Sequence, residues 1–234
     1  MNHEILASAR ARRITRLCHF TPSRNLVHII ADQRGVLATK RLLAEERAAF
    51  NATDLCRYDG YPDHVCCSIE YPNAWYFRKA RDKDPIFRDW VVLLLRPDPL
   101  WVADTKFCPR NAAAGGGRYV GTGPAAFDSM FAPSVLGAGD RDRTRGPAHP
   151  AFLPTDEQAE VLVPDSISQA DLVGIAVRDE SQARRELARI ETLMQQPPPV
   201  FIAPDFFRPE WLSNGLRVGR RPTETLYVHG GADA

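Results

Sequence analysis

The chain has 234 residues, of which 44% are hydrophobic and 25% are charged, and it carries 30 Lys and Arg against 29 Asp and Glu. These proportions are typical of one globular domain and exclude a disordered or fibrous chain. A domain of this size buries enough apolar surface to fold without disulfides or metals, which excludes a stapled mini-protein. The formal charge of +1 excludes a polybasic coat protein, so any contact with nucleic acid must come from local clusters of basic residues.

The longest apolar stretch, Trp90 to Leu95, has the length of a strand and is far too short to span a membrane. The N-terminus lacks a long apolar segment followed by a cleavage site, which argues against secretion. The five cysteines are odd in number and include the adjacent pair Cys66 and Cys67. Together with six scattered histidines, these features predict a cytoplasmic protein without membrane contact, disulfide framework or bound metal.

The front half of the chain predicts a mixture of strands and helices. Ser23 suits a helix N-cap and Gly35 a helix stop, so a strand should lead directly into a helix between them. Pro72 fits the first turn of a further helix, and the continuous apolar run at 90–95 is typical of a buried strand. We expect strands at 14–20, 64–70 and 90–95 and helices at 24–33, 41–50 and 73–81.

From residue 109 to 154 the chain is rich in Gly, Pro and Arg. Such a segment, with one short helical candidate at 125–131, is typical of a functional loop or of disorder. Regular structure should resume with strands at 157–163, 172–177 and 200–203 and a helix at 181–194. We expect one domain over residues 1–212 with a loop-rich insertion at 110–154, followed by a basic tail over 213–234.

Two polar clusters near the end of this insertion are candidates for function. In a strand over 157–163, Gln158 and Glu160 project from the same face, which places a carboxamide beside a carboxylate. A solvated outer strand face would give the same pattern. The loop upstream carries basic side chains suited to following single-stranded phosphate, namely Arg141, Arg143, Arg145 and His149. The alternative for this loop is a solvated run of charges.

Two motifs of the chain are the more specific ones, Leu17-Cys18-His19-Phe20-Thr21 leading into Asn25-Leu26, and Gln158-Ala159-Glu160-Val161-Leu162-Val163. Gly35-Val36-Leu37 and Arg57 lie between them. This set of motifs resembles the DarT family of DNA ADP-ribosyltransferase toxins. Order and spacing match along most of the chain, whereas the glycine-rich insertion matches poorly.

The resemblance implies an α+β fold, with an ADP-ribosyltransferase-like split β-sheet core, flanking helices and a long Gly/Arg-rich loop before the catalytic strand. It implies NAD as co-substrate and Glu160 as the catalytic carboxylate, since cleavage of the nicotinamide–ribose bond develops positive charge on the ribose. Arg57 would grip NAD and assist catalysis, because a guanidinium suits a pyrophosphate. The other implied NAD contacts are His19, Thr21, Asn25, Ser68, Tyr71 and Tyr76.

By this resemblance the chain transfers ADP-ribose to a base of single-stranded DNA, as the toxin of a pair whose antitoxin is of the macrodomain type. Gln158 can pair with the edge of a neutral base, which favours a base over an arginine side chain as acceptor. Guanine and thymine stay open. The alternatives are transfer to RNA and a catalytically silent nucleic-acid-binding relative. A second candidate path for nucleic acid is the basic tail, with Arg217, Arg220 and Arg221.

Overall fold

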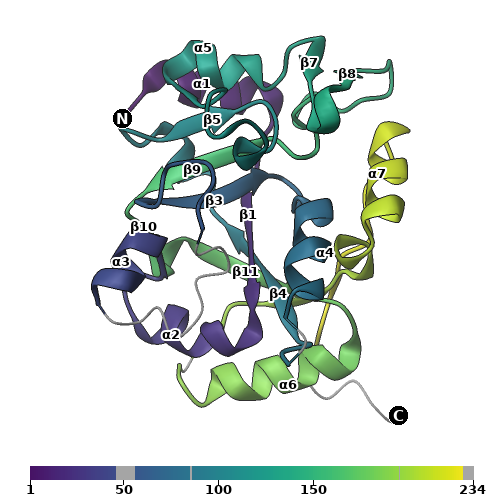
Figure 1. Ribbon diagram of the computed structural model, residues 1–234. Helices are drawn as coiled ribbons and strands as arrows, with labels where there is room; N and C mark the ends of the chain where they lie inside the picture. The colour runs from purple at the N-terminus through teal and green to yellow at the C-terminus, as the bar shows by residue number, and fades with distance from the viewer. Residues whose placement is uncertain (46–55, 85, 195, 229–234) are drawn as a thin grey trace.

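The computed structural model describes residues 1–45, 56–84, 86–194 and 196–228. Its centre is a nine-stranded sheet in the order β13-β12-β11-β4-β1-β3-β9-β5-β6 (Figure 1). Adjacent strands run antiparallel, apart from the parallel pair β11 and β12. The strands are β1 (Leu17–Pro22), β3 (His64–Ile69), β4 (Trp90–Leu95), β5 (Lys106–Cys108), β6 (Gly121–Thr122), β9 (Glu160–Pro164), β11 (Leu172–Val177), β12 (Val200–Ile202) and β13 (Thr225–Leu226).

The sheet is split between β1 and β3. β1 pairs with β4 along all 6 of its residues. In contrast, β1 pairs with β3 only at Leu17 and Cys18. Because the two strands diverge beyond Cys18, the following residues of β1 have no backbone partner on the β3 side. The predicted split-sheet core is therefore confirmed, and the split lies beside the His19 motif.

Apolar side chains cover both faces of the sheet. Since side chains alternate along a strand, Leu93 of β4 belongs to one core cluster while its neighbours Val92 and Leu94 belong to another. Phe77 of α4 and Leu212 of α7 complete the second cluster, and Figure 1 shows these two helices on the same side of the sheet. The helices are α1 (His3–Arg12), α2 (Leu26–Ala31), α3 (Thr39–Ala44), α4 (Ala74–Asp82), α5 (Gly123–Ser129), α6 (Glu180–Glu191) and α7 (Pro209–Arg217).

Most predicted elements are present with shifted ends. The strand expected from residue 14 begins at Leu17, and the helix expected at 24–33 is a short 3-10 turn followed by α2. The helix expected at 41–50 is present as α3, and the part of that prediction beyond residue 45 lies outside the described residues. The sequence pattern does not predict α1, which buries only Ile5 and Ala9 and therefore has a weak apolar face.

The 110–154 insertion contains more regular structure than its composition predicts. α5 matches the helical candidate at 125–131 and buries Phe127. β7 (Ser134–Leu136) and β8 (Asp142–Thr144) form a separate two-stranded sheet, which Figure 1 shows beside α5. A second small sheet joins β2 (Val36–Leu37) to β10 (Ser166–Ile167).

The strand expected at 157–163 begins only at Glu160. Gln158 lies in a turn before the strand, where its backbone N–H donates a hydrogen bond to Oδ1 of Asp156 at 2.9 Å. This Asx-type turn competes with the strand conformation. The prediction that Gln158 and Glu160 share one strand face is therefore wrong.

The segment expected to be a tail contacts the domain as far as Tyr227, whose backbone N–H donates to the carbonyl of Val200. α7 runs through residue 213, and both Ser213 and Leu216 are buried. β13 then pairs with β12, and Glu224 receives two hydrogen bonds from Arg16 at 2.6 Å each. In the part of the chain that the structure describes, none of the helices is both long enough and apolar enough to traverse a bilayer.

Candidate active site

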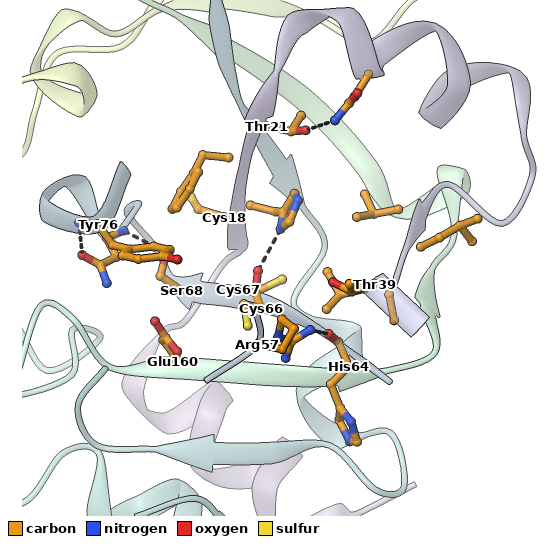
Figure 2. Close-up of a pocket in the computed structure, with 18 of the residues that line it drawn as sticks. Cys18, Thr21, Thr39, Arg57, His64, Cys66, Cys67, Ser68, Tyr76 and Glu160 are labelled. Atoms are coloured by element: carbon orange, nitrogen blue, oxygen red, sulfur yellow. Dashed lines mark hydrogen bonds between the residues drawn. The ribbon is translucent and has the colours of Figure 1, made fainter. Parts of the chain in front are cut away.

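A cavity opens where β1 and β3 diverge (Figure 2). Its walls come from β1, the turn into α2, the loop before β3, β3 itself, the start of α4 and the first residue of β9. The structure therefore brings together residues from both of the motifs that the sequence singled out. The predicted site residues that line this cavity are His19, Thr21, Asn25, Arg57, Ser68, Tyr76 and Glu160.

His19 bridges the gap between the diverging strands. Its Nδ1 lies 2.8 Å from the carbonyl oxygen of Cys66, and because a carbonyl only accepts, Nδ1 carries the proton. Burial, together with the nearby charge of Arg57, lowers the pKa of His19, so the ring is neutral at neutral pH. In this tautomer Nε2 is a hydrogen-bond acceptor, able to bind a hydroxyl or amide donor.

Thr21 and Asn25 are joined across the turn that follows β1. Nδ2 of Asn25 donates a hydrogen bond to Oγ1 of Thr21 at 2.8 Å, and Thr21 is almost completely buried. The pair therefore fixes the end of β1 against the beginning of α2. Both side chains line the cavity, as the His-Phe-Thr to Asn motif implied.

Arg57 is a buried cation held by a buried anion. Its Nη2 lies 2.7 Å from Oδ2 of Asp59, its Nε lies 3.2 Å from Oδ1 of Asp59, and its Nη1 donates to the carbonyl of His64. The backbone of Arg57 has a φ of 36°, which is uncommon for a residue with a side chain. Strain of this kind is typical of a site where the surrounding structure imposes one orientation.

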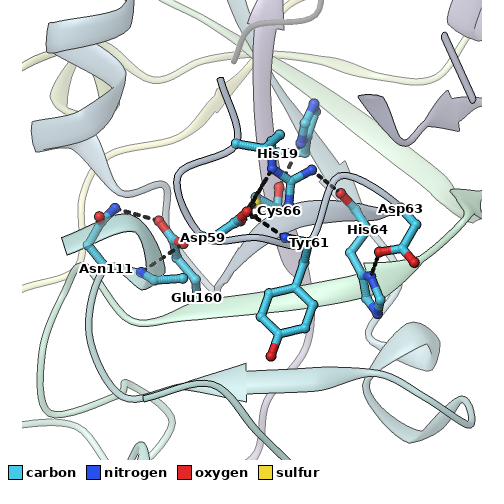
Figure 3. A network of polar contacts seen from close by, with 10 residues as sticks. His19, Asp59, Tyr61, Asp63, His64, Cys66, Asn111 and Glu160 are labelled. Carbon is cyan, nitrogen blue, oxygen red and sulfur yellow. Dashed lines mark hydrogen bonds and ion pairs between the residues drawn. The ribbon is translucent and has the colours of Figure 1, made fainter. Parts of the chain in front are cut away.

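Glu160 is the first residue of β9 and is 8% exposed. Its Oε1 accepts a hydrogen bond from Nδ2 of Asn111 at 2.7 Å, and its Oε2 accepts one from the backbone N–H of Ala112 at 3.2 Å (Figure 3). Burial raises the pKa of Glu160 to about 8, and the charge of Asp59 adds to this, whereas Arg57 and the two hydrogen bonds oppose it. Glu160 is thus largely protonated at pH 7 in the absence of a ligand.

The corner between β3 and α4 adds further polar groups to the cavity. Asn73 caps α4 by accepting a hydrogen bond from the backbone N–H of Tyr76 at 3.1 Å, and its own N–H donates to Oγ of Ser68 at 3.2 Å. Nδ2 of Asn73 is buried and makes no hydrogen bond to any described residue. A buried amide donor without a partner at a cavity wall suits a ligand with acceptor oxygens.

Tyr71 does not line this cavity, which corrects its prediction as an NAD contact. Its ring packs edge-on against Phe206, with centroids 5.8 Å apart, and the guanidinium of Arg16 lies 5.4 Å from its centroid. These partners come from the residue before β1 and from the segment before α7, and they hold the ring outside the first cavity.

A second cavity lies next to the first, and the two share Ser68. Arg143 and His149, predicted to contact nucleic acid, both line this second cavity, as do Tyr71 and Arg217. Arg141 is exposed on the same hairpin. The insertion therefore places part of its basic side chains beside the first cavity.

Arg145 and Gln158 line neither cavity. The guanidinium of Arg145 donates to the backbone carbonyls of Leu153 and Pro150, each at 2.7 Å. Arg145 therefore shapes the loop from within, and this corrects its prediction as a phosphate contact. His149 also has an internal contact, since its Nε2 lies 3.0 Å from the carbonyl oxygen of Pro154.

Three residues that contact the predicted site residues were not predicted from the sequence, namely Asp59, Asn73 and Asn111. Asn73 had a detectable signal, since Asn before a helix is a common N-cap. Asp59 and Asn111 had none, because an acid two residues after an arginine and an amide in a loop are ordinary surface patterns. Across the described ranges, no three His, Cys, Asp or Glu side chains gather closely enough to hold a metal ion.

Known proteins are similar to this chain in sequence or in fold. The sequence matches the family described as "ssDNA thymidine ADP-ribosyltransferase, DarT" over residues 18–208. No curated protein matches it. Among solved structures, Thermus sp. 2.9 DarT in complex with NAD+ is similar, with a TM-score of 0.53 and 17% identity over 82% of this chain and 97% of that chain. Its complex with ADP-ribosylated ssDNA gives a TM-score of 0.52 and 15% identity over 83% and 97%.

Thermosipho africanus DarTG in complex with ADP-ribose has a TM-score of 0.55 and 12% identity over 82% of this chain. The present chain spans about half of that one, which is covered over 51% of its length. The family match, together with the similar folds, places the molecule among the ADP-ribosyltransferases. Because the family match covers most of the chain, the protein belongs to the DarT family and is an NAD-dependent DNA ADP-ribosyltransferase. The resemblance inferred from the sequence motifs is confirmed.

The raised pKa of Glu160, about 8, predicts how activity depends on pH. A carboxyl that must be ionised to act loses activity about tenfold per pH unit below its pKa. We therefore expect kcat/KM for NAD consumption to rise about tenfold per pH unit from pH 5 to 7 and to level only above pH 8. Initial rates across this range test the expectation, and a plateau reached by pH 5 would contradict the raised pKa of Glu160.

Proposed function

We propose that this chain transfers ADP-ribose from NAD to thymine in single-stranded DNA. The observation that carries the proposal is the convergence of His19, Arg57 and Glu160, from three separate segments, on one cavity. The family description names thymidine and single-stranded DNA. Thermus sp. 2.9 DarT, which has a similar fold, has been solved with ADP-ribosylated ssDNA. Guanine is the alternative base.

The groups in the first cavity fit NAD. His19 offers the acceptor Nε2, and Asn73 offers a buried amide N–H that no described residue accepts. The positive charge of Arg57 suits the pyrophosphate, and Thr21 with Asn25 supplies polar contacts near a ribose. The ring of Tyr76 at the cavity wall suits the cationic nicotinamide ring, which an aromatic face attracts.

Glu160 has two consecutive tasks in the proposed transfer. The bond between ribose C1′ and the nicotinamide nitrogen breaks, the bonding electrons leave with nicotinamide, and a ring nitrogen of the base bonds to C1′. Ionised Glu160 stabilises the positive charge that develops on the ribose in the transition state. The same carboxylate then accepts the proton that the ring nitrogen loses, a task for which a pKa raised to about 8 is suited.

The second cavity is the proposed position of the DNA strand. It adjoins the first at Ser68, and Arg143 and Arg217 supply positive charge along it. Contacts of this kind with phosphates hold a strand in place without reading its sequence. Gln158 lies in the turn just before Glu160 and lines neither cavity, so the proposed strand path does not include it.

A toxin role follows from modification of DNA in a living cell. We propose that the chain acts in the cytoplasm as the toxin of a toxin–antitoxin pair and that a macrodomain-type antitoxin opposes it. Among the described residues, Cys18, Cys66, Cys67 and Cys108 form no disulfide, in keeping with a reducing compartment. Thermosipho africanus DarTG, with a similar fold, has been solved with ADP-ribose bound.

Replacing the catalytic carboxyl tests the proposal. Glu160→Gln keeps the shape of the side chain but removes its negative charge, so transfer should fall by roughly 100-fold or more while NAD still binds. The assay incubates each protein with labelled NAD and single-stranded DNA or RNA, followed by mass analysis of the nucleosides. Glu210→Gln, on the exposed face of α7, is the control and should act like the wild type.

Labelled thymidine from DNA is the expected product of the wild type. Labelled guanosine would overturn the choice of base, and labelled RNA the choice of polymer. No labelled product with any acceptor would favour the catalytically silent relative. Poor growth of cells expressing the wild type, relieved by Glu160→Gln, is expected from the toxin role.

The basic residues of the β7–β8 hairpin give a separate test. Arg141→Ala with Arg143→Ala should weaken binding of single-stranded DNA and reduce the slope of log affinity against log salt by about 0.7 per lost phosphate contact. NAD affinity should not change. Arg184→Ala, an exposed arginine on α6, is the matched control. An unchanged salt slope would move the DNA path elsewhere, such as to Arg217, Arg220 and Arg221.

A further inference from the structure

We propose that Asp59 is a positioning residue for the transfer reaction, an inference that rests on the proposed function. Its carboxylate fixes the guanidinium of Arg57 and acts on the carboxyl of Glu160, so both catalytic groups depend on it. Asp59 is 4% exposed and lies in the described segment just before β3. Figure 3 shows Asp59 in the polar network that also contains His19 and Glu160.

The carboxylate of Asp59 is held by more than one donor. Both of its oxygens receive N–H groups of Arg57, Oδ1 also receives the backbone N–H of Tyr61 at 3.0 Å, and Oδ2 lies 3.7 Å from Sγ of Cys66. A carboxylate bound on both oxygens has little freedom to rotate. Because Arg57 is buried as well, its guanidinium has one orientation, set by Asp59 together with the carbonyl of His64.

One loop contacts both acidic residues and sets their relative positions. Asn111 and Ala112, at its start, donate the two hydrogen bonds to Glu160. Gly117, at its end, packs against the backbone of Asp59 so closely that an added Cβ would lie 2.1 Å from the Asp59 carbonyl oxygen. The φ of Gly117 is 78°, which further favours glycine there. The glycine-rich run in the sequence therefore serves this contact.

The charges acting on Glu160 are few. Asp59 raises its pKa and Arg57 lowers it. Burial raises the pKa of the neighbouring thiols, so these are neutral at neutral pH; they are Cys66 and Cys67 of β3 and Cys108 of β5. Asn111 and Ala112 are neutral donors. When the charge of Asp59 is removed, the positive charge of Arg57 still acts on Glu160. This lowers the pKa of Glu160 and favours its ionised form.

The experiment compares pH profiles of transfer by the wild type and by Asp59→Asn, which keeps the side-chain shape. In Asp59→Asn the acid limb of kcat/KM should move to lower pH by about one unit. At a given pH on that limb, the ionised fraction of Glu160 would then be about tenfold higher. A purely structural role would lower the whole profile without moving the limb. Partial misfolding would likewise scale the profile and leave its midpoint in place.

Two variants serve as controls. Asp63→Asn removes the same charge from the same loop, but Asp63 pairs with His64 and is 55% exposed, so the limb should stay at the wild-type pH. Asp59→Glu keeps the charge and should also keep the limb. A limb that does not move in Asp59→Asn would overturn the proposal.

A second measurement needs no activity. The pKa of the Glu160 carboxyl is raised on folding. The free energy of unfolding therefore falls as the pH rises from the pKa of the carboxyl in the unfolded chain toward about 8. Urea unfolding measures the free energy of unfolding between pH 5 and 8, and this free energy should fall less in Asp59→Asn than in the wild type. When both proteins also carry Glu160→Gln, the two falls should be equal. A protein that shows this difference but modifies no DNA would refute the proposed function and support the role of Asp59.

Discussion

In the proposed mechanism, the reaction depends on three buried ionisable groups that share one wall of a cleft. Arg57 and Asp59 neutralise each other, and each would be costly to bury alone. Glu160 lies close to this pair, and burial raises its pKa so that it keeps its proton at neutral pH. The site at rest therefore holds little net charge. Binding of a cationic nicotinamide group would favour ionised Glu160, so the reactive form of the site depends on the substrate.

The fold creates this cleft by leaving a sheet incomplete. β1 is paired along its whole length with β4 but with β3 only at its first two residues, so the sheet is rigid on one side of the cleft and open on the other. His19 spans the opening through Cys66, and the loop from Asn111 to Gly117 holds the acidic residues on the opposite wall. Functional side chains placed on strands and fixed by neighbouring loops keep their geometry well.

Local signals in the sequence predicted much of the fold and part of the site. The apolar run at 90–95 gave β4, and the motifs around His19 and Glu160 identified two walls of the cleft. The prediction for Gln158 was wrong because the side chain of Asp156 holds the chain in a turn, so that the strand begins only at Glu160. The prediction that Tyr71 contacts NAD was wrong because its packing partner, Phe206, lies far along the chain. Asn111 contacts Glu160 from 49 residues away, and no periodicity or turn rule reports such a contact.

The ionisation of Glu160 in the protein without ligand tests this account most directly. Infrared difference spectra recorded across a pH titration, with Glu160→Gln as the blank, isolate the absorption of this one carboxyl group. The account predicts that Glu160 loses its proton near pH 8, where burial places its pKa. Loss of the proton between pH 4 and 5, as for an ordinary exposed glutamate, would contradict it.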